Sequence, residues 1–258
     1  MLVLLLSGCR YADVLESAPY VLSTGLGEVR AIALGSDGTA FVAGPKGVLE
    51  VQGDGKATVA LDGDARLVAA VPDRLFAVHG DVLEWTPRGA SFPGAVGGSM
   101  SLPGAVDLLA WCDGDLLVAY ADHMALWRVG QEAERPFGAP LDRIRAVAMG
   151  SPDCGSALAL TDDALWSVPA TGAPVQLARD LKAPRAVASD RLGRVWIVSG
   201  EPAALGRLDG SSLVPVASVG DARDVVFGQT GLYKPHNAYL AEGDGRIEYV
   251  HVADLSPP

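Results

Sequence analysis

Cysteine, aromatic residues and long hydrophobic runs are scarce in this chain. Only 3 cysteines and 6% aromatic residues are spread over 258 residues. A domain of this size buries about 70 to 75% of the surface of its unfolded chain, so its core does not depend on disulfides or metals. After the first six residues, no apolar run approaches the roughly 20 residues that a membrane-spanning helix requires. We expect one large domain without a transmembrane helix in its body.

Basic residues are also few, with 20 Lys and Arg against 31 Asp and Glu and a formal net charge of −11. Proteins that bind nucleic acid gain affinity by neutralising phosphates with clustered Lys and Arg. Here the basic residues are scattered along the chain. This composition argues against nucleic acid and anionic lipid surfaces as partners.

The common catalytic motifs are missing as well. No two of the histidines share a metal-ligand spacing, and no serine lies in a GxSxG turn. The histidines are His79, His123, His236 and His251. We therefore expect no catalytic residue, no metal and no cofactor.

What the chain does contain is a phrase that recurs six times at intervals of about 40 residues. Each copy reads as three short apolar strands separated by turns, and the third strand often closes on an aromatic residue such as Trp85, Trp127 or Trp166. The copies begin at Val29, Ala65, Val106, Ile144, Pro184 and Ala222. Aligned on their first strands, they place these residues at one position: Arg30, Arg66, Asp107, Arg145, Arg185 and Arg223.

Short runs rich in Val, Leu and Ile and bounded by Gly, Asp and Pro are typical of strands. Fourth strands are predicted in three copies, at 57–61, 174–178 and 213–217. Four strands per unit of this length indicate a β-propeller blade, whereas a β-solenoid has shorter and more uniform rungs. The predicted fold is all-β, a six-bladed β-propeller over residues 19–258. Its blades are expected near 29–61, 65–96, 106–139, 144–180, 184–218 and 222–252.

The two ends of the repeat complement each other. The sixth copy has no fourth strand, because only a short segment ending in two prolines follows residue 252 and proline cannot donate to a ladder. The segment 19–23, PYVLS, has the pattern of a strand but no blade of its own. We predict that it completes the last blade and closes the ring, which removes both exposed edges.

The final copy, NAYLAEGDGRIEYVHVAD, resembles the repeat of NHL and gluconolactonase-type propellers, in which a DG turn precedes a strand ending in an aromatic. The resemblance implies an alternative function, a metal-dependent hydrolase that holds a divalent cation with Glu, Asn and Asp oxygens. Glu28 lies near the position of such a glutamate, and Asn237 is the only asparagine in the chain. The motifs around these ligands are absent, so we favour Glu28 as a rim carboxylate beside Arg30.

The chain opens MLVLLLSGCR, and Leu6 to Cys9 resembles the lipobox of bacterial lipoproteins. This resemblance implies that residues 1–8 are a signal peptide, that Cys9 carries a lipid, and that 9–18 form a tether. No basic residue precedes Cys9, although a secretory signal begins with positive charge, so we expect 1–8 to be incomplete. Arg10 is not the aspartate that marks inner-membrane retention, which favours the outer membrane. The alternative is an ordinary apolar N-terminus on a cytoplasmic protein.

The recurrent arginines allow two interpretations. In a propeller the first strand of each blade lines the central channel, so Arg30, Arg66, Arg145, Arg185 and Arg223 are expected near one mouth of it. A ring of guanidinium groups could bind a carboxylate or phosphate through paired hydrogen bonds. Alternatively each arginine pairs with a neighbouring acid and joins adjacent blades. The acids that precede several of them, as in Asp64-Ala65-Arg66, favour the second interpretation.

Two further features remain open from the sequence. The sixth copy has extra residues between its first two strands, where Tyr233, Lys234 and His236 form either a partner loop or an inert insertion. Cys112 and Cys154 lie in neighbouring blades and would form a disulfide in an oxidising compartment, or they are two separately buried thiols. The expected function is a non-catalytic lipoprotein of the cell envelope, anchored to a membrane and facing the periplasm, with an envelope protein as its partner.

Overall fold

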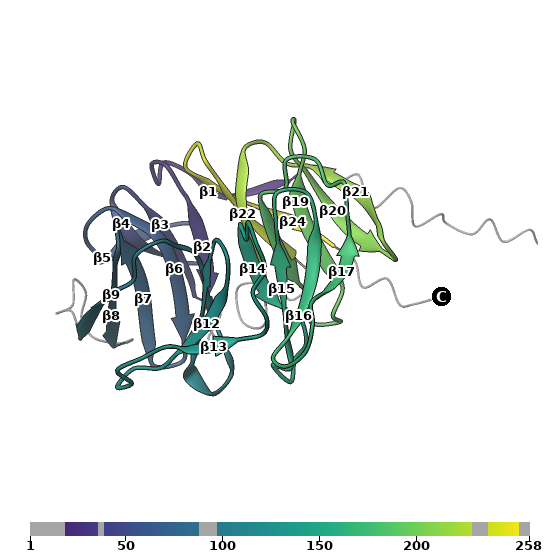
Figure 1. The fold of residues 1–258 in the computed structure, drawn as a ribbon. Helices are drawn as coiled ribbons and strands as arrows, with labels where there is room; N and C mark the ends of the chain where they lie inside the picture. Colours follow the sequence, from purple (N-terminus) through teal and green to yellow (C-terminus); the bar gives the residue numbers. More distant parts are fainter. Residues whose placement is uncertain (1–18, 36–38, 88–96, 229–236, 253–258) are drawn as a thin grey trace, which may run out of the picture.

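The computed structural model describes residues 19–35, 39–87, 97–228 and 237–252 of the chain. They form six four-stranded antiparallel sheets arranged as the blades of a ring (Figure 1). Helical structure within these residues is limited to one short 3-10 turn, η2 (Cys112–Gly114), and none of it is long and apolar enough to cross a membrane. The predicted all-β, six-bladed propeller is confirmed.

The four strands of each blade follow one another from the central channel to the outer edge of the ring. Blades one and two contain β2 (Ala31–Leu34), β3 (Ala40–Gly44), β4 (Gly47–Val51) and β5 (Ala57–Leu61), then β6 (Ala65–Val71), β7 (Arg74–His79), β8 (Val82–Pro87) and β9 (Gly98–Ser101). Blades three and four contain β10 (Ala105–Ala110), β11 (Leu116–Tyr120), β12 (Met124–Trp127) and β13 (Arg135–Phe137), then β14 (Ala146–Met149), β15 (Ser156–Leu160), β16 (Leu165–Pro169) and β17 (Val175–Ala178). Blades five and six contain β18 (Ala186–Ser189), β19 (Val195–Ser199), β20 (Ala204–Asp209) and β21 (Ser212–Ser218), then β22 (Ala222–Phe227), β23 (Asn237–Glu242), β24 (Arg246–His251) and β1 (Tyr20–Ser23).

The N-terminal strand completes the last blade, as predicted. β1 pairs antiparallel with β24, with Tyr20 opposite Tyr249. The two tyrosine rings stack with centroids 5.2 Å apart. Figure 1 shows the purple start of the described chain beside its yellow end. Strands from both ends of the chain therefore share one sheet.

The ring has two distinct faces. Because every blade has four antiparallel strands, the chain returns to the same side before each new blade begins, and all six inner strands run in one direction. We call the side where the inner strands begin the arginine face, since each recurrent arginine lies at that end. We call the opposite side, where the inner strands end, the disulfide face.

The core consists of six apolar layers, one between each pair of neighbouring blades. Between blades two and three, for example, Phe76, Trp85 and Trp127 pack with ring centroids 5.3 to 6.4 Å apart. Between blades six and one, Ile32 and Val42 pack against Tyr239 and Ile247. A blade therefore buries both faces of its sheet only when both neighbours are in place.

Two outer strands were not expected from the sequence. β9 and β13 supply fourth strands to blades two and three, although fourth strands were expected only in blades one, four, five and six. Blade two therefore extends to Ser101, beyond the expected boundary at residue 96. Neither strand has the apolar pattern of a core strand, since β9 reads GSMS and β13 reads RPF. Outer strands bury little, so their sequences carry a weak signal.

The junction between blades six and one contains a close backbone contact. Gly245, in the turn between β23 and β24, has φ +92°, and a Cβ added there would lie 2.3 Å from the carbonyl oxygen of Gly27. The N–H of Leu26 donates to the carbonyl of Gly245 at 3.1 Å. The turn of the last blade thus packs directly against the segment that leads into the first.

We expect Gly245→Ala to destabilise the protein by about 2 to 4 kcal/mol, since it adds overpacking to the cost of a left-handed alanine. Gly210→Ala is the matched control, because Gly210 also has positive φ, 59°, but open space where its Cβ would lie. Only the left-handed term, about 1 to 2 kcal/mol, should remain there. Denaturant unfolding measures both, and equal losses would contradict the close contact at the ring closure.

Candidate functional site at the channel mouth

The five recurrent arginines lie where the sequence places them, at the start of the inner strands on the arginine face. Arg66 and Arg223 belong to inner strands, and Arg30, Arg145 and Arg185 immediately precede them. Their guanidinium groups are partly exposed. What they contact decides whether this mouth is free to bind an anion.

Three of the arginines belong to one continuous charge network. Arg30 Nη1 donates to Asp64 Oδ1 at 2.6 Å and its Nη2 lies 3.5 Å from Glu28 Oε2. Arg223 Nη1 donates to Glu28 Oε1 at 2.6 Å and its Nη2 to Asp221 Oδ2 at 3.4 Å. Asp221 Oδ1 also accepts from Arg185 Nη1 at 3.0 Å. Three acids and three arginines alternate along this path.

This network joins blades rather than displaying charge. Its pairs connect blade five to six, six to one and one to two. Hydrogen bonds from Arg223 and then Arg30 hold the pKa of Glu28 below its ordinary value. Three positive and three negative charges offset each other. On this side of the ring, the observed contacts match the second interpretation of the arginines.

The other two arginines behave differently. Arg66 Nε donates to the carbonyl of Gly80 at 2.7 Å, and its Nη1 donates to the carbonyl of Ala105 at the start of blade three. Partial burial lowers the pKa of Arg66. Arg145 Nε donates to Asp162 Oδ1 at 2.6 Å, within its own blade. Only Arg66 of these two reaches a neighbouring blade through the contacts described.

The structure corrects the alignment of the third copy by one residue. Ala105 pairs with Tyr120 as Ala222 pairs with Glu242, a bulge follows, and Asp107 then pairs with Ala119 as Asp224 pairs with Ala241. Val106, not Asp107, is therefore the counterpart of the arginines. Asp107 corresponds to Asp224 of blade six. Blades two and six carry the same bulge, so the shift comes from starting the third copy at Val106 rather than at Ala105.

The candidate metal ligands do not come together. Glu28 lies on the arginine face and is bound by two arginines. Asn237 starts β23 on the disulfide face, where its Nδ2 donates to the Tyr239 hydroxyl at 3.2 Å and its Oδ1 lies 2.9 Å from His251 Nδ1. The two residues are at opposite ends of the blade height. This pair does not fit the divalent cation of gluconolactonase-type enzymes.

No group of three or more His, Cys, Asp or Glu side chains within the described ranges is placed to hold a metal ion. Cys9 and the loop residues Tyr233, Lys234 and His236 lie outside those ranges.

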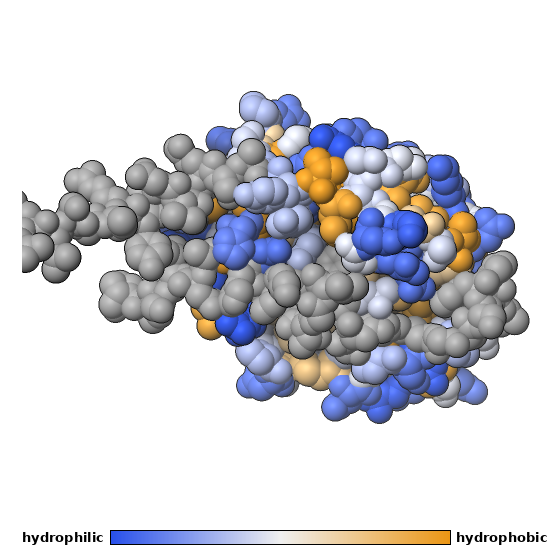
Figure 2. All heavy atoms as spheres, turned by 180° about the vertical axis from the view of Figure 1, so that it is seen from behind, coloured by the Kyte–Doolittle hydropathy of each residue, from blue (hydrophilic) through white to orange (hydrophobic). Residues whose placement is uncertain are grey.

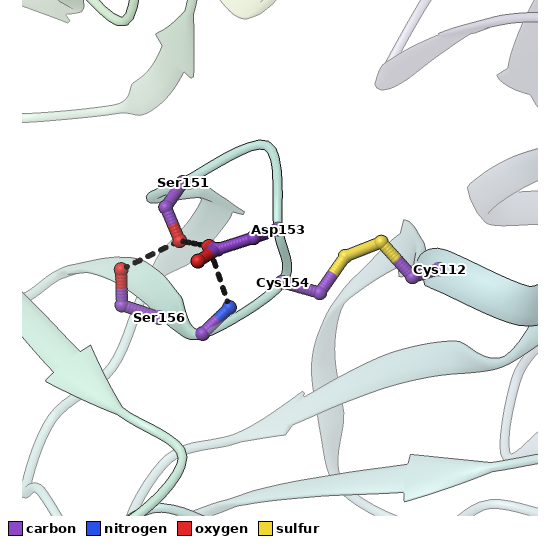
Figure 3. Close-up of a disulfide and its surroundings, with 6 residues drawn as sticks. Cys112, Ser151, Asp153, Cys154 and Ser156 are labelled. Carbon is purple, nitrogen blue, oxygen red and sulfur yellow. Dashed lines mark hydrogen bonds between the residues drawn. A yellow bond between two sulfur atoms is a disulfide. The ribbon is translucent and has the colours of Figure 1, made fainter.

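Cys112 and Cys154 form a disulfide on the disulfide face (Figure 3). It joins the loop after β10 to the loop after β14, so it connects blades three and four, with the two Cα atoms 6.2 Å apart. The loop around Cys154 is held by Asp153, whose Oδ1 accepts from Ser151 Oγ at 2.5 Å and from the Gly155 N–H at 3.1 Å. The structure therefore does not contain the two separately buried thiols that the sequence also allowed.

One carboxyl group beneath the arginine face was not singled out by the sequence. Glu242, at the end of β23, is 0% exposed, and neither of its oxygens has a hydrogen-bond partner in the described part of the chain. Burial, and then the charge of Glu248, raise the pKa of Glu242 to about 7. A buried carboxyl without partners is costly when charged. In the sequence, Glu242 occupies a position on β23 that alternation assigns to the core, so the sequence alone did not identify it as a charged group of interest.

Comparisons with known proteins establish the fold and no more. No protein-family model and no curated protein matches the chain. A gluconolactonase from Xanthomonas campestris is 17% identical with a TM-score of 0.66, over 89% of this chain and 87% of that one. A PQQ-bound aldose sugar dehydrogenase from Streptomyces coelicolor is 13% identical with a TM-score of 0.66, over 90% and 96% of the two chains.

The WD40 propeller domain of Doa1 reaches the same TM-score of 0.66 at 12% identity, over 90% of this chain and 97% of that one. Propellers of gluconolactonase, sugar dehydrogenase and WD40 type are thus equally similar in shape to this chain. These likenesses support the propeller fold alone. A function does not follow, because one fold carries many functions.

We expect Glu242→Gln to stabilise the protein at pH 8 by about 2 kcal/mol and to have almost no effect near pH 4. The pKa of Glu242 is raised in the folded state, so the folded protein loses stability as pH rises toward 7 and the buried carboxyl group ionises. Glutamine does not ionise, so the variant keeps this stability. Denaturant unfolding as a function of pH measures the difference. Glu132→Gln, at an exposed position, is the control. A gain for Glu242→Gln that does not change with pH would contradict the assignment.

Proposed function

We propose that this chain is a non-catalytic binding propeller of the bacterial cell envelope, anchored to a membrane through a lipid on Cys9. The network at the channel mouth is the observation that carries the non-catalytic part. Glu28, the residue that a metal-dependent hydrolase would use, is bound by Arg30 and Arg223. The same network occupies the three arginines that would otherwise bind an anionic substrate. The charged residues of this network therefore serve to connect neighbouring blades.

The disulfide supports a location outside the cytoplasm. Disulfides persist in oxidising compartments such as the periplasm and are rare in the cytosol. Cys112 and Cys154 are paired, which leaves Cys9 as the third cysteine and matches its role as a lipid carrier. Together with Arg10, this favours the periplasmic side of the outer membrane.

The position of β1 suggests how such an anchored ring is oriented. β1 is the outer strand of blade six, antiparallel to β24, so Tyr20 lies at the disulfide face and Ser23 at the arginine face. A tether of residues 9–18 spans at most about 35 Å when extended. It would therefore keep the disulfide face near the membrane and turn the arginine face toward the periplasm and a protein partner.

The face of the molecule shown in Figure 2 is largely hydrophilic where the described residues form it. Seen from behind the view of Figure 1, apolar side chains form several separate spots in a largely hydrophilic surface (Figure 2). Val175 and Leu192, 58% and 52% exposed, are the most exposed of the large aliphatic residues in the described ranges. They lie on different blades.

Cys9→Ala should release the protein from the membrane fraction into the periplasmic fraction, since it removes the acceptor of the lipid. The control is the double variant Cys112→Ser/Cys154→Ser, which keeps Cys9 and should stay with the membrane. Fractionation followed by immunoblotting distinguishes them. Unchanged membrane association of Cys9→Ala would remove the lipoprotein part of the proposal.

A photo-crosslinking amino acid at Asp163, exposed on the arginine face, should capture one envelope protein in intact cells. The same group at Leu192, on the disulfide face, should capture far less of it. Equal capture from both positions would contradict the proposed orientation. A stoichiometric divalent metal in the purified protein, with hydrolysis of sugar lactones, would overturn the binding function in favour of the gluconolactonase-like alternative.

A further inference from the structure

Two aspartates occupy a special place on the inner strands. Asp107 and Asp224 are the only acids on β2, β6, β10, β14, β18 and β22, all of which the structure describes completely. They hold the same position in blades three and six, as their strand registers show. In a ring of six, the third and sixth blades are opposite each other. The two carboxylates therefore approach the channel from opposite sides.

Each carboxylate bonds to the backbone of the next blade. Asp107 Oδ2 accepts from the Val147 N–H of blade four at 2.7 Å, and Asp224 Oδ2 accepts from the Ile32 N–H of blade one at 2.8 Å. Each Oδ1 accepts from the following residue of its own strand at 2.8 Å. The two bonds cross the junctions that divide the ring into blades one to three and blades four to six.

The charged groups nearest to these strands are already engaged elsewhere. On the inner strands and directly before them lie five arginines, and on the second strand of blade six lies Glu242. Their contacts are Arg30 with Asp64 and Glu28, Arg66 with the Gly80 and Ala105 carbonyls, Arg145 with Asp162, Arg185 with Asp221, Arg223 with Glu28 and Asp221, and Glu242 near Glu248 and Arg246. β14, β18 and β11 carry no Asp, Glu, Lys, Arg or His.

The protonation of the pair follows from this setting. Burial, and then the charge of Asp224, raise the pKa of Asp107 to about 7. Burial raises the pKa of Asp224 to about 6. The backbone N–H groups favour the charged forms but do not outweigh burial. Near neutral pH, one charge in the channel is tolerated and the second is resisted.

We propose that Asp107 and Asp224 form a proton-controlled latch that holds the two halves of the ring together along one diameter. With one or both carboxyls protonated, the channel carries at most one negative charge and both junctions stay closed. When both are ionised, their repulsion in a low-dielectric channel weakens the same two junctions. The latch would respond to acidification of the surroundings by tightening.

The direction of the effect is set by linkage. Both pKa values are higher in the closed ring than the ordinary value near 4, so the closed state binds protons more tightly than an opened one. The equilibrium constant for closing the ring therefore falls as pH rises from about 4 to 7, by up to about tenfold per pH unit for each group still protonated. The disulfide crosses the junction that Asp107 holds. The junction between blades six and one, which Asp224 holds, is therefore expected to open more readily.

Hydrogen exchange of the full chain, carried out in the Glu242→Gln background so that Glu242 does not titrate, tests the latch. Protection factors corrected for intrinsic exchange should fall at Ile32 and Val147 by about tenfold or more between pH 5 and pH 8. Val187, the corresponding residue of blade five, has no aspartate of the described ranges bound to it and should change much less. This comparison needs no variant at the latch itself. A fall at Val187 equal to that at Ile32 and Val147, or no fall at all, would overturn the proposal.

The variant Asp107→Asn/Asp224→Asn should flatten the pH dependence at Ile32 and Val147, since neither position can then ionise. Asn accepts with only one oxygen, so some protection is lost at every pH, and the slope with pH is the deciding quantity. Asp209→Asn, at the exposed end of β20 in blade five, is the matched control and should keep the wild-type slope. An undiminished slope in the double variant would also overturn the latch.

Discussion

The antiparallel pairing of β1 with β24 is the interaction on which the rest of this structure depends. Every blade buries apolar side chains against two neighbours, and the layer between blades six and one contains Ile32, Val42, Tyr239 and Ile247. If β1 did not pair with β24, blade six would lose its fourth strand, and the first and last blades would lose one of the connections between them. Ring closure gives every blade a neighbour on both faces, so that the apolar side chains on both sides of each sheet are covered.

The polar contacts between blades are distributed unevenly around the ring. Charge pairs join blades five, six, one and two, whereas an arginine bound to a carbonyl joins two and three. Blades three and four share a carboxylate bond and a disulfide, and four and five share the bond from Ser189 Oγ to the Met149 carbonyl, 2.7 Å long. The exposed charge pairs among these contacts contribute little to the free energy of folding. Their value lies in fixing the register of one blade against the next, while the apolar layers supply the stability.

The sequence predicted the architecture well, because the repeat is carried by buried strands with a strong apolar pattern. The inner and middle strands and the closing strand 19–23 were identified for this reason. β9 and β13 escaped, since their exposed residues follow no pattern. At the site, the arginine positions were predicted, but their partners come from other blades and depend on geometry. Asp107 was misaligned because the third copy was started one residue too late, at Val106, which the apolar pattern allows. Glu242 was missed because burial without a partner is a tertiary property.

Blade six is the one blade described here that combines distant parts of the chain, and this has a consequence for biosynthesis. β1 leaves the ribosome first and must remain unpaired until β24 has been made, more than two hundred residues later. Growing domains generally fold as they emerge, but here the ring cannot close before β24 has emerged. A factor that delays premature pairing of β1, or export of the chain before it folds, would suit this order of assembly.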